Sequence, residues 1–141
     1  MKHVGVFRPE WIGNKSGLFS IWLDAPGMVY CTATWIELRL GEHRRTRVVF
    51  SGHSELASGV ELHTGPLAPE DYIPEMIPPD QELLPLPVDT KPSDVIGRHR
   101  ERIAARRDLV CFDAVSLMTN MTRRSQRLFD YLVTRGFYSP L

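Results

Sequence analysis

The side chains best suited to chemistry lie in two short segments, His53-Ser54-Glu55 and Glu61-Leu62-His63, on either side of a stretch of small residues. A turn in that stretch would bring the two segments face to face, as in a hairpin. Imidazole and carboxylate groups both bind zinc and iron in proteins. The candidate metal ligands are His53, Glu55, Glu61 and His63. Their spacing matches no established ligand motif, so surface or packing roles are the expected ones.

Other patterns that mark catalytic sites do not occur in the sequence. The segment Gly52-His53-Ser54-Glu55-Leu56 is not a nucleophile elbow, because leucine stands where the second glycine belongs. Neither GxGxxG nor GKS or GKT is found, so no glycine-rich phosphate-binding loop is predicted. Asp108 and Asp113 offer an acid and a base, but nothing in the sequence positions a partner for them. The sequence therefore favours a protein that is not an enzyme and indicates no cofactor.

Arginine is the more informative residue type, since it outnumbers lysine fourteen to three. Its planar guanidinium binds phosphates and carboxylates through paired hydrogen bonds. The helical region would present a basic face made of Arg98, Arg100, Arg102, Arg106, Arg107, Arg123, Arg124 and Arg127. Three interpretations stay open: packing against acids of the chain itself, binding of an acidic protein, and binding of nucleic acid. Few aromatic residues accompany the arginines and no helix-turn-helix or RNP-type motif is seen, so nucleic acid is not favoured.

The segment 65–92 differs in composition from the rest of the chain. It holds eight of the eleven prolines, and acids are interleaved with apolar residues along it. Proline removes a backbone donor and favours extended backbone in the residue before it, so we expect neither a helix nor a central strand here. A disordered linker would usually contain fewer apolar residues. We therefore predict an extended acidic arm that lies on a surface, either the chain's own sheet edge or a partner.

The net charge of zero conceals a division of charge along the chain. Residues 1–53 carry seven basic and four acidic side chains. Residues 54–92 carry one basic and eight acidic side chains, and residues 93–141 carry nine basic and five acidic ones. Such a division favours contact through charged surfaces. The candidate partner-binding residues are Arg98, Arg102, Arg106, Arg123 and Arg127 in the basic part, and Tyr72, Glu75, Asp80 and Glu82 in the arm.

The elements that must position these groups begin with a sheet. The strongest strand pattern is 28–40, which is rich in β-branched and aromatic residues and alternates between two faces. A turn at Asp24-Ala25-Pro26-Gly27 joins it to the strand before it in a hairpin. The other predicted strands are 3–7, 18–23, 45–50 and 60–63. Short connections favour antiparallel pairing, so we expect a four- or five-stranded, mainly antiparallel sheet or partial barrel.

Helices are predicted in the C-terminal third of the chain. Residues 95–107 have a narrow apolar stripe, and 122–135 have a wide apolar face that a cap at Thr119 or Asn120 would precede. The apolar run 109–118 fits either a buried helix or a buried strand, with helix favoured. We expect two or three helices packed on one face of the sheet.

The two cysteines, Cys31 and Cys111, are expected to be buried free thiols in apolar surroundings. No CxxC pair occurs, so a thiolate zinc site is not predicted. No apolar run approaches the roughly 20 residues that a membrane span needs, and the N-terminal residues lack the apolar core of a signal peptide. We expect a cytoplasmic protein that does not enter the membrane.

The 141 residues suit a single domain of the α+β class. It comprises a sheet region at 1–64, the acidic arm at 65–92 and a helical region at 93–141. The favoured function is that of a small interaction protein, a subunit, adaptor or inhibitor that binds a larger protein or assembly. Its size suits an accessory protein of a bacterium or phage. Nucleic-acid binding through the arginine-rich helices is the first alternative, and a metal-dependent enzyme at His53 and His63 is the second.

Overall fold

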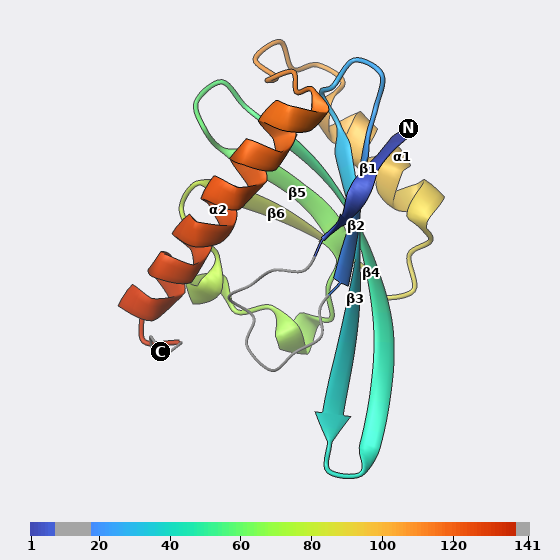
Figure 1. Ribbon diagram of the computed structural model, residues 1–141, viewed down its shortest axis with the longest axis vertical. Coiled ribbons are helices and arrows are strands. Elements are labelled where there is room, and N and C mark those ends of the chain that lie inside the picture. Colours follow the sequence, from blue (N-terminus) through green and yellow to red (C-terminus); the bar gives the residue numbers. More distant parts are fainter. Residues whose placement is uncertain (8–17, 138–141) are drawn as a thin grey trace.

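A six-stranded sheet forms the middle of the fold, with its strands side by side in the order of the sequence (Figure 1). The computed structural model describes residues 1–7 and 18–137. The elements in these residues are β1 (Lys2–Phe7), β2 (Leu18–Leu23), β3 (Tyr30–Leu40), β4 (His43–Glu55), β5 (Glu61–Pro66), β6 (Gln81–Leu86), α1 (Pro92–Ile103) and α2 (Ala114–Thr134). Two short 3-10 turns, Pro69–Asp71 and Pro74–Met76, lie between β5 and β6.

The sheet is mainly antiparallel and open. Every neighbouring pair from β1 to β5 runs antiparallel, and β6 runs parallel to β5. Because β1 and β6 form two separate edges, the sheet does not close into a barrel. The predicted α+β class and mainly antiparallel sheet are therefore confirmed. The described residues hold six strands, however, instead of the four or five expected.

The β2–β3 hairpin turns at residues 24–27, as the sequence predicts. The carboxylate of Asp24 accepts hydrogen bonds from the backbone N–H groups of Met28 (2.9 Å) and Val29 (3.1 Å). Gly27 has a φ of 78°, and a Cβ at this position would lie 2.1 Å from the carbonyl oxygen of Phe112. Glycine is therefore required both by the left-handed backbone of the turn and by the close passage of the segment that precedes α2.

β4 is longer than the strand pattern predicts. The predicted strand covers 45–50, but β4 continues through small polar residues to Glu55. These residues have the composition of a loop, yet Ser54 is fully buried. α1 passes so close to the sheet that a Cβ on Gly52 would lie 3.1 Å from His99. The small residues allow this close helix packing, and their composition alone does not distinguish such a strand from a loop.

The acidic arm lies on the chain's own sheet, one of the two surfaces that the sequence leaves open. It supplies β6, which pairs with β5 in parallel. Pro85 is tolerated there because β6 is an edge strand, and the outer side of an edge needs no backbone donor. A parallel pair was not predicted. Parallel strands need a long crossover connection, which is usually a helix, and no helix is predicted between these two strands. Here the crossover consists of the two 3-10 turns and extended chain.

The two helices lie on opposite faces of the sheet, not on one face as predicted (Figure 1). Cys31 of β3 belongs to an apolar cluster with Ile103 of α1, whereas Tyr30 belongs to a cluster with Leu117 of α2. Successive side chains of a strand point to opposite faces. The sheet is therefore the central layer between α1 and α2.

α2 begins eight residues before the predicted helix at 122–135, and its cap is neither Thr119 nor Asn120. Asp113 is the cap: its carboxylate accepts a hydrogen bond from the Ser116 N–H (2.7 Å), and the Ser116 hydroxyl oxygen accepts one from the Asp113 N–H (3.0 Å). This reciprocal pair is a capping box. The sequence pattern does not reveal this cap, because the apolar residues that follow Asp113 continue the run at 109–118.

That run is therefore divided between extended chain and helix. Leu109 forms a bridge with Leu56 of the sheet region, and the helix begins only at Ala114. Cys111, in the extended part, is exposed, which corrects the prediction that both cysteines are buried. In extended chain alternate side chains point away from the body of the protein. Cys31 is buried as predicted, and burial raises the pKa of its thiol to about 12.

Replacing Asp113 by alanine should lower the free energy of unfolding by about 1 kcal/mol, because the cap of α2 is lost. Urea unfolding followed by circular dichroism measures the change. Thr122→Ala in the same helix is the control, since among the described residues its hydroxyl bonds to the Met118 carbonyl alone, one turn earlier in the helix. That variant should change stability by less than about 0.5 kcal/mol. Equal losses in the two variants would contradict the capping role.

Candidate functional site

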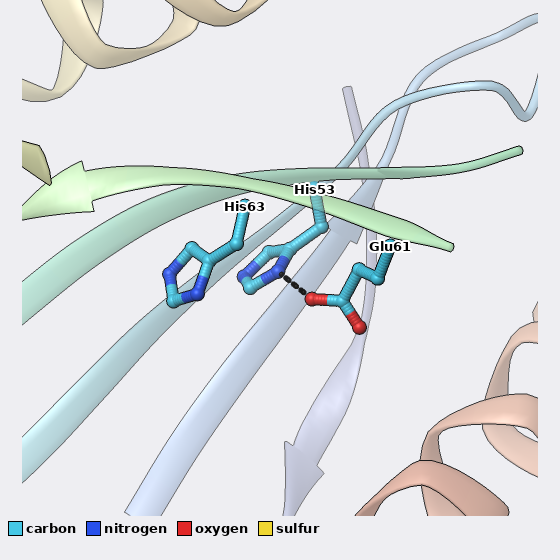
Figure 2. A group of neighbouring side chains, drawn as sticks. All are labelled: His53, Glu61 and His63. Carbon is cyan, nitrogen blue, oxygen red and sulfur yellow. Dashed lines mark hydrogen bonds and ion pairs between the residues drawn. The ribbon is translucent and has the colours of Figure 1, made fainter. Parts of the chain in front are cut away.

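Polar and charged side chains gather on the face of the sheet that α2 covers. In the antiparallel pair β4–β5, His53 lies opposite His63 and Glu55 lies opposite Glu61. Because alternate residues of a strand share a face, all four side chains are on the same side of the sheet. Figure 2 shows His53, Glu61 and His63 next to one another on these two strands. The structure thus brings together the two segments that the sequence analysis placed on either side of a turn.

His53 is held from several sides. Its Nδ1 lies 2.8 Å from a carboxylate oxygen of Glu61, and its Nε2 lies 3.0 Å from the Thr32 hydroxyl. Its ring stacks on Tyr30, with the centroids 4.8 Å apart, and on His63, with the centroids 4.4 Å apart. Tyr30 and His63 are its partners on the two neighbouring strands. The imidazole of His53 therefore has a fixed orientation in the middle of the sheet.

Three of the four predicted metal-ligand candidates converge. Donor atoms of His53, Glu61 and His63 all lie within 4.8 Å of one another. The Gln81 side chain of β6 adds an amide nitrogen 3.5 Å from Glu61 and 3.4 Å from Nδ1 of His63. Glu55, the fourth candidate, lies outside this group and instead contacts α2.

A buried arginine of α2 neutralises the carboxylates. The Arg124 guanidinium contacts Glu55 and lies 3.3 Å from Glu61 and 3.6 Å from Asp80. Its side chain is only 11% exposed, and those of Glu55 and Glu61 are 6% and 8% exposed. Charges at this depth are tolerated because they are paired. The sequence does contain a signal for this role, since Arg124 lies seven residues after the buried Leu117 and so on the same helix face.

The surroundings set the protonation of the cluster. Burial alone would raise the pKa of Glu61, but the hydrogen bond from His53 and the positive charges of the histidines and Arg124 lower it to about 2. Burial lowers the pKa of His63 to about 3, and the neighbouring charge of His53 adds to this effect. Burial also raises the pKa of Tyr30 well above its ordinary value. At neutral pH, Glu61 is therefore a carboxylate and His63 a neutral imidazole.

A cavity of about 170 Å³ lies between this cluster and α2. Its walls include His53 and Glu61 from the sheet and Arg124 and Arg127 from the helix. The Arg127 side chain is 55% exposed, so the cavity reaches solvent at this residue. Small ions and molecules thus have a route to the cluster.

A second polar group, on the opposite face of the sheet, was not singled out from the sequence. His99 of α1 is fully buried, with Nε2 2.8 Å from the Ser54 hydroxyl and Nδ1 2.8 Å from the Thr64 hydroxyl. The Ser54 hydroxyl donates to the Met28 carbonyl (2.7 Å), so it accepts from Nε2–H of His99, and Thr64 donates to Nδ1. The ring is therefore a neutral histidine with both nitrogens bonded.

The arginines do not form the single basic face considered from the sequence. α1 and α2 lie on opposite faces of the sheet, and the five arginines singled out as partner-binding each have an acidic neighbour in the chain. The ion pairs are Arg98–Glu101, Arg102–Glu82, Arg106–Asp108, Arg123–Glu55 and Arg127–Asp80. Those of Arg102 and Arg127 join the helices to the acidic arm. Asp80 and Glu82 are therefore engaged within the chain.

The remaining acids of the arm lie beside an apolar groove. This arm groove, formed by residues 67–70, Tyr72 and residues 85–89, has a volume of about 800 Å³. Tyr72 and Val88 are 42% and 52% exposed in it. The acids at and near the groove are Glu70, Asp71, Glu75 and Asp89, all exposed and without an ion pair to any described residue. Of the predicted partner-binding residues, Tyr72 thus lines the groove and Glu75 lies in the same connection.

Neither helix in the described part of the chain combines the length and the apolar character that crossing a bilayer requires. Comparisons of the chain with protein-family models, with curated proteins and with solved structures gave no match. Function is therefore inferred from the side chains and surfaces of the chain itself.

Proposed function

We propose that the protein is a small interaction protein, a subunit, adaptor or inhibitor, that binds a basic and extended segment of a larger protein in its arm groove. The observation that carries the proposal is the groove itself, which is apolar along its walls and has at its rim exposed carboxylates that form no ion pair with a described residue. Exposed apolar surface bordered by polar groups is typical of sites that bind other proteins.

The groove indicates the chemistry of the segment that it would bind. Tyr72 and Val88 offer contact area to an aliphatic or aromatic side chain. Glu70 and Asp89 attract lysine or arginine and orient the approach of a basic partner. β6 is the last strand of the sheet, so within the described residues one side of its backbone faces no other strand, and this edge suits an added extended segment.

The placement of the arginines favours a protein partner over nucleic acid. A phosphate backbone is bound by cations aligned along one surface. Here the arginines of α1 and α2 are divided between two faces, and several already pair with acids. The unpaired acids beside the groove would repel phosphates.

Selection of a phage-displayed peptide library on the full-length protein tests this proposal. We expect the enriched peptides to combine two or more lysines or arginines with an aliphatic or aromatic residue. The affinity of the best peptide is then measured by fluorescence polarisation. It should fall by about 10-fold or more in the double variant Glu70→Lys/Asp89→Lys, because two attractive charges become repulsive.

A second double variant, Glu42→Lys/Asp130→Lys, controls for the change in net charge. Both of its acids are exposed and neither lines the arm groove. It should bind the peptide within about twofold of the unchanged protein, because exposed charges away from the site contribute little. Enrichment of acidic peptides, or equal losses in the two double variants, would contradict the proposal.

A further inference from the structure

We propose that His53, Glu61 and His63 together bind a divalent transition-metal ion, with zinc as the best match. The donors are two imidazole nitrogens and one carboxylate oxygen on two adjacent strands, all within 4.8 Å of one another (Figure 2). Two histidines and one carboxylate are the protein ligands of several zinc sites and of many non-haem iron sites. The arm groove plays no part in this site, so the inference goes beyond the proposed function.

The spacing of the donors requires only side-chain movement. Bonds of 2.0–2.1 Å place two ligand atoms of a tetrahedral zinc ion about 3.3 Å apart. His53 Nδ1 and Glu61 Oε1 are 2.8 Å apart, so an ion between them needs slightly more room. The ring of His63 stacks on that of His53 with 26° between their planes, and it must turn for a nitrogen to join the same ion. The paired strands themselves keep their places.

Two of the three ligands already have the outer partners that support a metal site. Glu61 directs Oε1 to His53 and keeps Oε2 3.3 Å from Nε of Arg124. His53 directs Nδ1 to Glu61, while its Nε2 lies 3.0 Å from the Thr32 hydroxyl. Histidines that bind metals usually donate their second N–H to such a group, which fixes the ring and its tautomer. In the metal-free site Nδ1–H of His53 donates to the Glu61 carboxylate and Nε2 accepts from the Thr32 hydroxyl. When a metal ion binds Nδ1, the ring takes its other tautomer, and Nε2–H donates to the Thr32 hydroxyl instead. Glu61 Oε2 stays beside Arg124.

Access and charge balance also suit a cation. The cavity beside α2 is lined by His53 and Glu61 and reaches solvent at Arg127. Arg124 would repel an incoming cation, but Glu55 and Asp80 lie within ion-pair distance of its guanidinium and offset this repulsion. Arg102 of α1 also approaches the ligands, since it donates to the His63 carbonyl (2.8 Å), and Glu82 at 3.8 Å offsets part of its charge. Gln81, which contacts Glu61 and His63, is uncharged.

Calorimetric titration of the metal-free, full-length protein with zinc chloride tests the proposal. We expect one ion to bind per chain and the melting temperature to rise with zinc concentration, because zinc binds the folded state in preference. X-ray absorption of the zinc-loaded protein should show imidazole scattering from two histidines, a readout that needs no variant to fold. His63→Ala and Glu61→Gln should each weaken zinc binding by more than about 100-fold, because a direct ligand should cost more than a supporting group, whose loss costs about 10- to 100-fold.

His3→Ala is the matched control. It removes an exposed imidazole that contacts Ser20, outside the cluster. Its zinc affinity should stay within about twofold of the unchanged protein. The proposal is overturned if zinc binds at well below one ion per chain, if the absorption spectrum shows no imidazole ligands, or if His3→Ala weakens binding as much as His63→Ala does. These outcomes do not depend on whether the arm groove binds peptides.

Discussion

Replacing Arg124 by methionine should lower the free energy of unfolding by about 3–5 kcal/mol, the usual cost of removing one partner from a buried ion pair. Without the guanidinium, Glu55 and Glu61 remain buried, and no cation at the same depth neutralises both of them in the described chain. Methionine retains most of the apolar stem of arginine, so the loss in free energy of unfolding comes from the missing charge and not from poorer packing. Urea unfolding followed by circular dichroism at neutral pH measures it.

Arg123→Met is the control for this prediction. Arg123 is the preceding residue of the same helix and also pairs with Glu55, at 3.7 Å, but its side chain is 57% exposed. An exposed ion pair contributes at most about 1 kcal/mol, so this variant should stay close to the unchanged protein. Adding Glu61→Gln to Arg124→Met should recover part of the loss, because one of the unpaired buried charges is removed. Equal losses for Arg123→Met and Arg124→Met would show that the buried network does not stabilise the fold.

Stability should also fall as the pH is lowered from 6.5 to 4, with His99 responsible for about 3 kcal/mol of the fall. Burial lowers the pKa of His99 from 6.5 to about 4; the positive charges of His53 and Arg102 add to this effect, and the negative charge of Glu61 opposes it. Between these two values the unfolded chain binds a proton that the folded chain does not, so acid favours unfolding. Above pH 6.5 the contribution of His99 is fully present, and below pH 4 no further loss arises from it.

The hydrogen bonds explain why protonation is unfavourable. Neutral His99 donates to Ser54 and accepts from Thr64, and the Thr64 hydroxyl oxygen also accepts from Arg102 (3.3 Å). A protonated ring would have an N–H at Nδ1, so the hydroxyl hydrogen of the fully buried Thr64 would lose its acceptor there. The new positive charge would also lie close to that of Arg102. Urea unfolding between pH 7 and pH 4 should therefore show a flatter pH dependence for His99→Gln than for the unchanged protein.

His3→Ala serves as the control in that experiment, because His3 is exposed and outside the buried network. Its stability should depend on pH as that of the unchanged protein does. His63 also has a lowered pKa and loses stability in the same direction, but it is present in every variant compared. Parallel pH profiles for His99→Gln and the unchanged protein would contradict the role assigned to His99.

Local patterns in the sequence were sufficient for much of the sheet. The alternation at 28–40 and the turn at Asp24-Ala25-Pro26-Gly27 act between neighbouring residues, and both features occur in the structure. The strand β6 was not predicted because Pro85 is compatible with a strand only at an edge, and no local pattern shows which strand is at an edge. The faces covered by the helices depend in the same way on contacts between distant residues.

In the candidate site, too, some features follow from neighbouring residues and others depend on contacts between distant parts of the chain. His53, Glu61 and His63 were selected from the sequence because a hairpin brings nearby segments together, which needs only local information. Arg124 was one of the eight arginines of the predicted basic face. Its spacing from Leu117 indicates the helix face that it shares, but not its partners, because Glu55 and Glu61 lie more than 60 residues earlier in the chain. Its role follows from the packing of α2 on that face of the sheet.

The strands β4 and β5 supply polar groups to both faces at once, with Glu61 beneath α2 and Thr64 beneath α1. If β5 slid along β4 by one residue, every side chain would change sides. Glu61 would then be pressed among apolar residues near Ile103, and Leu62 would take its place beside Arg124. Each such misalignment leaves a buried charge without a counterion. The polar residues of β4 and β5 therefore destabilise an alignment shifted by one residue relative to the native one, which favours the native pairing during folding.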